Sequence, residues 1–102
     1  MSWHSVADVE ALRNDEALGL SVLGHEIALC LVDGEHYAIG NVCTHQHAFL
    51  SDGFVENGYI ECPLHQGRFD IRTGKAMGAP VATPIQTYQV KVEDGKVLVY
   101  ID

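Results

Sequence analysis

Short runs of β-branched, aromatic and other apolar residues recur along the chain, separated by turn dipeptides that end in glycine. The clearest alternation lies near the end of the chain. There Tyr88, Val90 and Val92 alternate with polar neighbours, as in a strand with one buried face. The pattern predicts strands over residues 27–32, 37–39, 59–61, 88–92 and 97–101.

Dipeptides that favour tight turns separate these runs: Leu23-Gly24, Asp33-Gly34, Asp52-Gly53, Asn57-Gly58, Thr73-Gly74 and Asp94-Gly95. Asp33-Gly34 and Asp94-Gly95 have the composition of two-residue hairpin turns. Helical character is confined to residues 6–12. The sequence therefore predicts an all-β fold, an antiparallel β-sandwich or small barrel. Residues 43–70 differ from the rest, and we expect a pair of loops with a short hairpin there, standing on the β scaffold.

Length and composition fit a single domain over residues 1–102, with 47% apolar and 20% charged residues. The formal net charge is -8, which argues against nucleic acid and anionic membranes as partners. An acidic surface permits docking on a basic protein, although solubility alone would also explain it. The chain begins without a basic region followed by an apolar run, and no stretch approaches the length of a membrane span. We therefore expect a cytoplasmic protein.

Two short motifs combine the residue types that bind metals. Cys43-Thr44-His45 and Cys62-Pro63-Leu64-His65 each offer one thiolate and one imidazole within a few positions, so a single loop can direct both at one centre. The third cysteine, Cys30, lies in a predicted apolar strand and is expected to pack as a small hydrophobic residue.

Zinc and a binuclear iron–sulfur cluster both accept two cysteines and two histidines. Structural zinc sites usually pair like ligands, with C-x2-4-C and H-x3-5-H spacing, whereas here each motif mixes the two types. A cluster with two cysteines on one iron and two histidines on the other explains the mixture better. Two neutral imidazoles in place of two thiolates also leave the oxidised site neutral, which makes it easier to reduce.

A longer set of motifs resembles one family. The residues are Cys43-Thr44-His45, Leu50-Ser51-Asp52-Gly53, the run from Ile60 through Cys62-Pro63-Leu64-His65-Gln66-Gly67-Arg68-Phe69-Asp70, then Thr73-Gly74-Lys75 and Ala79-Pro80-Val81. Together they resemble the Rieske [2Fe–2S] ferredoxins of bacterial aromatic-ring-hydroxylating dioxygenases, most of all the naphthalene-dioxygenase type. The resemblance extends over nearly the whole chain.

This resemblance implies a Rieske fold whose cluster-binding subdomain covers approximately residues 41–82. It places Cys43 and Cys62 on one iron and His45 and His65 on the other. It implies an electron carrier and not an enzyme, a monomer that takes single electrons from a flavin-containing ferredoxin reductase and passes them to a terminal oxygenase in aromatic hydrocarbon catabolism. The alternatives are a small Rieske subunit of another oxidoreductase, such as nitrite reductase, and a redox-sensing module.

Departures from related proteins refine the expected cluster. High-potential Rieske proteins carry an extra cysteine in each cluster loop and hydroxyl donors after the second histidine ligand. Here the extra cysteines are absent, and the matching positions, Gly67 and Phe69, have no hydroxyl. Hydrogen bonds to cluster sulfur stabilise the reduced state, so their loss predicts a potential near the low end of the Rieske range, about −150 mV.

Several neighbouring residues carry weaker expectations. His47 follows the first motif, but the ligand set is complete without it, so we interpret it as a loop histidine. Gly67 is expected to bring its backbone amide close to cluster sulfur. Arg68 and Asp70 would either pair to brace the second loop or be solvated. Pro80 belongs either to a third loop over the cluster or to an ordinary turn.

Overall fold

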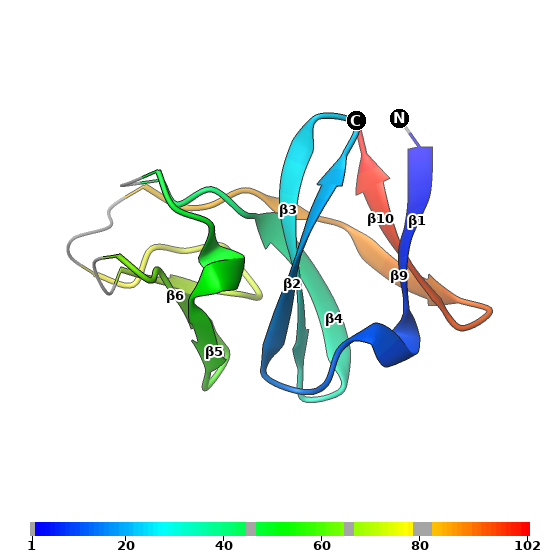
Figure 1. Cartoon of the computed structure of the whole chain (residues 1–102), viewed down its shortest axis with the longest axis horizontal. Coiled ribbons are helices and arrows are strands. Elements are labelled where there is room, and N and C mark those ends of the chain that lie inside the picture. Colours follow the sequence, from blue (N-terminus) through cyan, green and yellow to red (C-terminus); the bar gives the residue numbers. More distant parts are fainter. Residues whose placement is uncertain (1, 45–46, 65–66, 79–82) are drawn as a thin grey trace.

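The computed structural model describes residues 2–44, 47–64, 67–78 and 83–102. Its strands form three antiparallel sheets (Figure 1). The first sheet has the order β1 (Ser2–Asp8), β10 (Lys96–Ile101), β9 (Val90–Glu93). The second has the order β2 (Glu16–Val22), β3 (His25–Val32), β4 (Glu35–Gly40), β8 (Thr87–Tyr88). The third consists of β5 (Phe54–Glu56), β6 (Tyr59–Glu61) and β7 (Arg68–Asp70).

Strand β3 explains how the sheets are held together, because its side chains alternate between two hydrophobic cores. Ile27, Leu29 and Leu31 pack with β10 residues between the two larger sheets. The intervening side chains face the other core, which includes Ile60 and Phe69 of the third sheet. Both faces of β3 are therefore buried, which accounts for its nearly continuous apolar sequence. The third sheet stands at one end of the molecule, on the outer face of the β-sandwich (Figure 1).

The hairpin predictions are confirmed. Asp33-Gly34 joins β3 to β4, and Asp94-Gly95 joins β9 to β10. Both residues of each turn have positive φ, at 50° and 78° in the first and 51° and 75° in the second. This backbone matches the twist of paired antiparallel strands, and aspartate and glycine adopt it at low cost.

Two predicted elements are wrong in detail. The helix expected over residues 6–12 is the end of β1 followed by a 3-10 turn, Val9–Ala11. Pairing with β10, in which Ala7 lies opposite Val97, overrides the local helical pattern. The strand expected over residues 88–92 divides at Gln89. Tyr88 pairs with Ala38 in the second sheet, whereas Val90 pairs with Val99 in the first.

Strands β1, β2, β5 and β7 were not predicted, and residues 54–70 hold a three-stranded sheet where a single hairpin was expected. Two further short elements complete the described fold, the 3-10 turns Val9–Ala11 and Leu50–Asp52. Within the described ranges, no helix has the length and apolarity that crossing a membrane requires.

Candidate metal centre

The first cysteine motif lies in a loop that is closed by backbone hydrogen bonds. Beyond β4, Val42 forms an isolated antiparallel bridge with Phe49. One residue further on, the Cys43 N–H donates to the Ala48 carbonyl at 2.9 Å. Cys43 therefore stands at the base of the loop, where only 4% of its surface is exposed.

The buried side chain of Asn41 fastens both ends of this loop. Its Oδ1 accepts from the Ser51 N–H at 2.8 Å, and its Nδ2 donates to the Ser51 Oγ at 3.0 Å. The Leu50 N–H also donates to the Asn41 carbonyl at 2.7 Å. A buried amide without hydrogen-bond partners would cost free energy of folding, so these bonds are favoured. They fix the place where the chain leaves β4 at Asn41 and the place where it comes back beside Asn41 at Leu50 and Ser51.

The second cysteine motif occupies the loop between β6 and β7 and has the same construction. The Cys62 N–H donates to the Gly67 carbonyl at 2.7 Å, so Cys62 also stands at the base of a closed loop. Cys62 is 1% exposed and Gly67 is buried, whereas Leu64 toward the tip is 62% exposed. Beneath the loop, Phe69 fills the core with no exposed surface, at the position where the high-potential proteins are expected to carry a hydroxyl donor.

Hydrogen bonds attach the two described ends of a third segment, residues 77–83, beside the two cysteine loops. The Met77 N–H donates to the Arg68 carbonyl at 2.9 Å, next to the base of the second loop. The Thr44 Oγ1 donates to the Thr83 carbonyl at 2.9 Å, in the first loop. Pro80, which was expected either in a third loop over the cluster or in an ordinary turn, lies outside the described residues. The bonds of Met77 and Thr83 nevertheless attach both ends of the segment to the cysteine loops.

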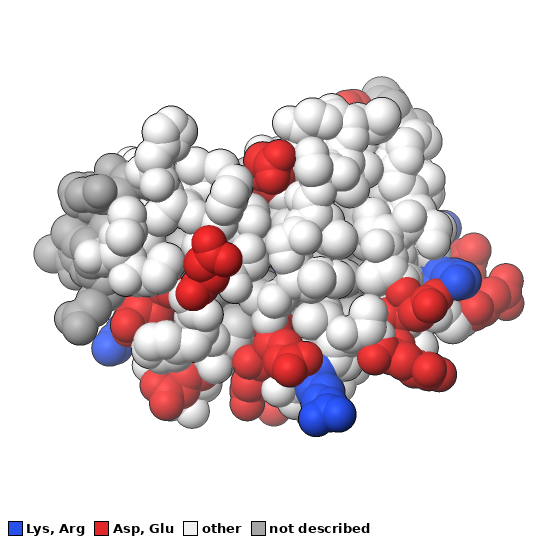
Figure 2. Space-filling model, viewed as in Figure 1, with Lys and Arg blue, Asp and Glu red and all other residues white. Residues whose placement is uncertain are grey.

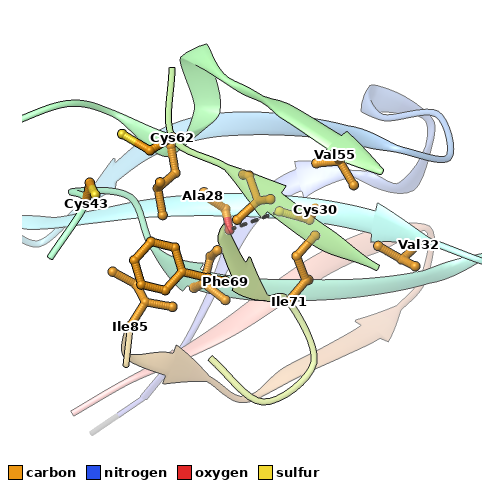
Figure 3. Packing of buried hydrophobic residues seen from close by; sticks show 12 residues of the cluster. Ala28, Cys30, Val32, Cys43, Val55, Cys62, Phe69, Ile71 and Ile85 are labelled. Carbon is orange, nitrogen blue, oxygen red and sulfur yellow. Dashed lines mark hydrogen bonds between the residues drawn. The ribbon is translucent and has the colours of Figure 1, made fainter. Parts of the chain in front are cut away.

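The two base cysteines belong to one cluster of buried residues and lie toward the same end of it in the view of Figure 3. Buried thiols at the bases of two adjoining loops fit a metal centre with thiolate ligands on one side. Each loop carries a histidine by sequence, but His45 and His65 lie outside the described residues. The complete ligand set therefore stays a prediction.

Cys30 belongs to the core, as expected. It has no exposed surface, its Sγ faces the Ala28 carbonyl at 4.0 Å, and it lies in Figure 3 away from the other two cysteines. Burial raises the pKa of the Cys30 thiol to about 12, so the thiol stays protonated at neutral pH.

Of the two alternatives for Arg68 and Asp70, pairing with each other is wrong. The Arg68 Nε donates to the Glu61 Oε1 at 3.0 Å, across β6 and β7. This bond is the main cause that raises the pKa of Arg68 above its usual value. Asp70 instead accepts from the backbone N–H groups of Arg72 and Thr73, at 2.9 and 3.2 Å, because the chain turns directly after β7.

His47 is exposed on the first loop, as a loop histidine should be, and lines a surface hollow of about 310 Å³ with Phe49 and Glu26. Sequence reasoning did not single out Phe49, which is 46% exposed beside the site. The buried Glu61, 8% exposed, was also missed. Its position directly before Cys62 was the available signal, because a carboxylate inside a strand next to a ligand motif needs a partner.

The comparisons with known proteins agree with this geometry. Residues 2–89 match the model of the Rieske [2Fe-2S] domain. The ferredoxin component of the naphthalene 1,2-dioxygenase system of Pseudomonas putida is 48% identical over 99 residues, which is 97% of this chain and 95% of that protein. The structure of a Sphingomonas yanoikuyae B1 ferredoxin matches with a TM-score of 0.94 and 36% identity, over 99% of this chain and 100% of that one.

A further match is the structure titled as the complex of reduced oxygenase and oxidized ferredoxin in carbazole 1,9a-dioxygenase. It has a TM-score of 0.91 and 30% identity, over 95% of this chain and 100% of the matched chain. The fold is an all-β scaffold with two closed loops that have buried cysteines at their bases. This geometry and the relatives named above together identify the family. The chain belongs to the Rieske [2Fe–2S] proteins and, within them, to the ferredoxin components of aromatic-ring dioxygenase systems.

Proposed function

We propose that this protein carries single electrons from a flavin-containing reductase to the terminal oxygenase of an aromatic-ring-hydroxylating dioxygenase system. Its cluster is held by Cys43, His45, Cys62 and His65. The observation that supports this proposal most directly is that Cys43 and Cys62 are both buried in one hydrophobic cluster, at the bases of two loops and toward the same end of the cluster in Figure 3. The cluster supplies a one-electron couple, which we place near the low end of the Rieske range, about −150 mV.

The described residues hold the centre and shield it from water. The closing bonds of Cys43 and Cys62 fix where each ligand leaves the scaffold. Phe69, fully buried, and Ile85, 7% exposed, form the apolar floor beneath them. We assign approximately residues 41–82 to the cluster-binding subdomain of a single domain over residues 1–102.

The end of the molecule that carries the loops is suited to contact with partners. Three sequence segments, 36–51, 62–67 and 76–90, contain no Asp, Glu, Lys or Arg. They include the exposed side chains of Leu64 and Met77, at 62% and 48%. Figure 2 shows the acidic side chains gathered mainly along the lower margin of the molecule and at the end opposite the loops. We assign apolar contact to the loop end, while the acidic margin orients the carrier on basic partners.

Because one cluster serves two partners, the reductase and the oxygenase use the same end in turn. This requires transient complexes, and long-range attraction between charges favours fast encounter without tight binding. We further place the carrier in the cytoplasm and propose that it is a monomer. Sedimentation of the holoprotein tests the oligomeric state.

The test is electron transfer itself. Reduced protein is mixed anaerobically with the oxidised terminal oxygenase of a naphthalene dioxygenase system, and reoxidation is followed by visible absorption. Rapid single-electron transfer that slows with added salt is expected. Transfer to a nitrite reductase catalytic subunit, but not to any ring-hydroxylating oxygenase, would favour the alternative assignment.

Matched variants locate the contact surface. Leu64→Glu is expected to slow the transfer, because it places a charge on the apolar end. Leu23→Glu changes an equally accessible leucine, 71% exposed, in the β2–β3 turn and should leave the rate unchanged. Equal effects of the two substitutions would contradict docking through the loop end.

A further inference from the structure

We propose that the Glu61–Arg68 ion pair is a potential-setting and positioning element of the cluster site. It keeps a buried carboxylate from opposing reduction and fastens the loop that carries Cys62 and His65. The inference rests on the proposed ligand set and assigns a role to two residues outside it.

The pair occupies the last rung of the sheet before the second loop. Glu61 and Arg68 lie directly opposite each other in the antiparallel register of β6 and β7. Their side chains meet at 3.0 Å between Arg68 Nε and Glu61 Oε1. The next closure is the bond from the Cys62 N–H to the Gly67 carbonyl. The ion pair and this bond together hold both ends of the six-residue segment 62–67.

The two partners differ in their exposure. The Glu61 side chain is 11% exposed and that of Arg68 is 49% exposed. A carboxylate buried this deeply, one residue from a cluster ligand, is costly to leave uncompensated. A cluster that gains an electron becomes more negative, so an unpaired Glu61 would oppose reduction through a medium that screens charge poorly.

Arg68 is held in place from several sides. Its guanidinium lies 4.9 Å from the centre of the Tyr59 ring, and the Tyr59 hydroxyl donates to the Glu56 Oε2 at 2.8 Å. Its own carbonyl accepts from the Met77 N–H at 2.9 Å. The cation therefore occupies a defined place between the second loop and the third segment. It is also the basic residue closest in sequence to the four proposed ligands.

Four variants separate the effect of the two charges from the effect of fastening the loop. They are Glu61→Gln, Arg68→Gln, the double variant and Arg68→Lys. The readout is the midpoint potential, from spectroelectrochemical titration of the holoprotein at fixed pH and ionic strength. Arg68→Gln should lower the constant for electron uptake three- to tenfold, where tenfold corresponds to 59 mV for a one-electron couple. Glu61→Gln should raise it. The double variant should return to within twofold of wild type, and Arg68→Lys should stay close to it.

Arg72→Gln is the matched control for net charge. Arg72 pairs with Asp33 at 3.2 Å and is 46% exposed, much like Arg68, but it contacts the β3–β4 turn instead of the ligand loop. The Arg72→Gln substitution should change the equilibrium constant for electron uptake by less than twofold.

Three results would overturn the proposal. One is an equal shift in Arg68→Gln and Arg72→Gln, which would show an effect of net charge alone. Another is a fall in potential for both single variants at Glu61 and Arg68. The third is a double variant whose midpoint potential stays as low as that of Arg68→Gln, although no charge is left unpaired in it. An error in the ligand set would instead appear as a cluster that survives His65→Ala, so the two failures are distinguishable.

Discussion

Gly53→Ala is expected to destabilise the protein severely, although Gly53 is not a ligand. Gly53 ends the 3-10 turn Leu50–Asp52, where its N–H donates to the Leu50 carbonyl at 2.9 Å. Its Cα packs against the backbone of β6. A Cβ at this position would lie 1.8 Å from the Glu61 carbonyl oxygen and 3.2 Å from that of Leu50. Both obstacles are backbone atoms, so no rotation of a side chain relieves the clash.

The magnitude follows from that geometry. The turn and β6 would have to separate by more than an ångström, directly before Cys62. Overpacking of this kind costs about 3 kcal/mol, at the upper end of the usual range. With a urea dependence of roughly 1–3 kcal/mol/M for a small domain, the midpoint should fall by about 1–3 M. The shift of β6 should also weaken retention of the cluster.

The assay is urea unfolding of the anaerobic holoprotein, followed by far-ultraviolet circular dichroism and by visible absorption of the cluster. Gly95→Ala is the control, because nothing lies within 4 Å of its added Cβ and its φ is 75°. That substitution carries only the cost of a left-handed backbone, about 1 kcal/mol. Equal midpoints for the two variants would refute the close-contact explanation.

Three further predictions concern residues beside or beneath the site. Because burial raises the pKa of Cys30 to about 12, its thiol should resist iodoacetamide at pH 8 in the folded protein. Cys30→Ala should keep the cluster spectrum at a cost of about 1–2 kcal/mol in urea unfolding, and loss of the spectrum would contradict its core role. The Nε2 of His36 is buried without a hydrogen-bond partner among the described residues, and burial lowers the pKa of His36. As pH falls below about 6.5, His36 therefore takes up a proton more readily in the unfolded chain than in the folded protein. The free energy of unfolding should decline from pH 7 to 5 as a result. His36→Leu should flatten that decline in urea midpoints measured at each pH, and an unchanged slope would contradict the assignment. Thr44→Val removes the bond to the Thr83 carbonyl and should cost about 1 kcal/mol and speed cluster loss to a chelator, whereas Thr44→Ser should do neither. Equal rates for the two variants would show that the bond does not hold the loops together.

The sequence predicted most of the fold where local chemistry decides it. Aspartate–glycine turns fixed the β3–β4 and β9–β10 hairpins, and the apolar run of β3 was recognisable because both its faces are buried. The prediction failed where tertiary pairing decides. Nothing local at Gln89 shows that the chain passes from one sheet to another. Residues 6–12 have a helical sequence pattern, but pairing of β1 with β10 gives residues 6–8 an extended backbone.

The site was predictable to a similar extent. The spacing of two mixed cysteine–histidine motifs pointed to Cys43 and Cys62, which the structure buries at the bases of two loops, while their role as ligands stays a prediction. The bonds that close each loop were not predictable, because they run between backbone atoms whose meeting depends on the register of β6 and β7. The same register explains the wrong partner for Arg68. Residues two apart on a strand share a face, but Glu61 lies directly opposite and closer.

The central claim, that Cys43, His45, Cys62 and His65 hold a Rieske cluster, is tested most directly by the visible spectrum and iron content of two histidine variants. His65→Ala should lose the Rieske spectrum, while His47→Ala, an exposed histidine on the first loop, should retain it with two irons per chain. A cluster that survives His65→Ala but is lost in His47→Ala would contradict the ligand assignment.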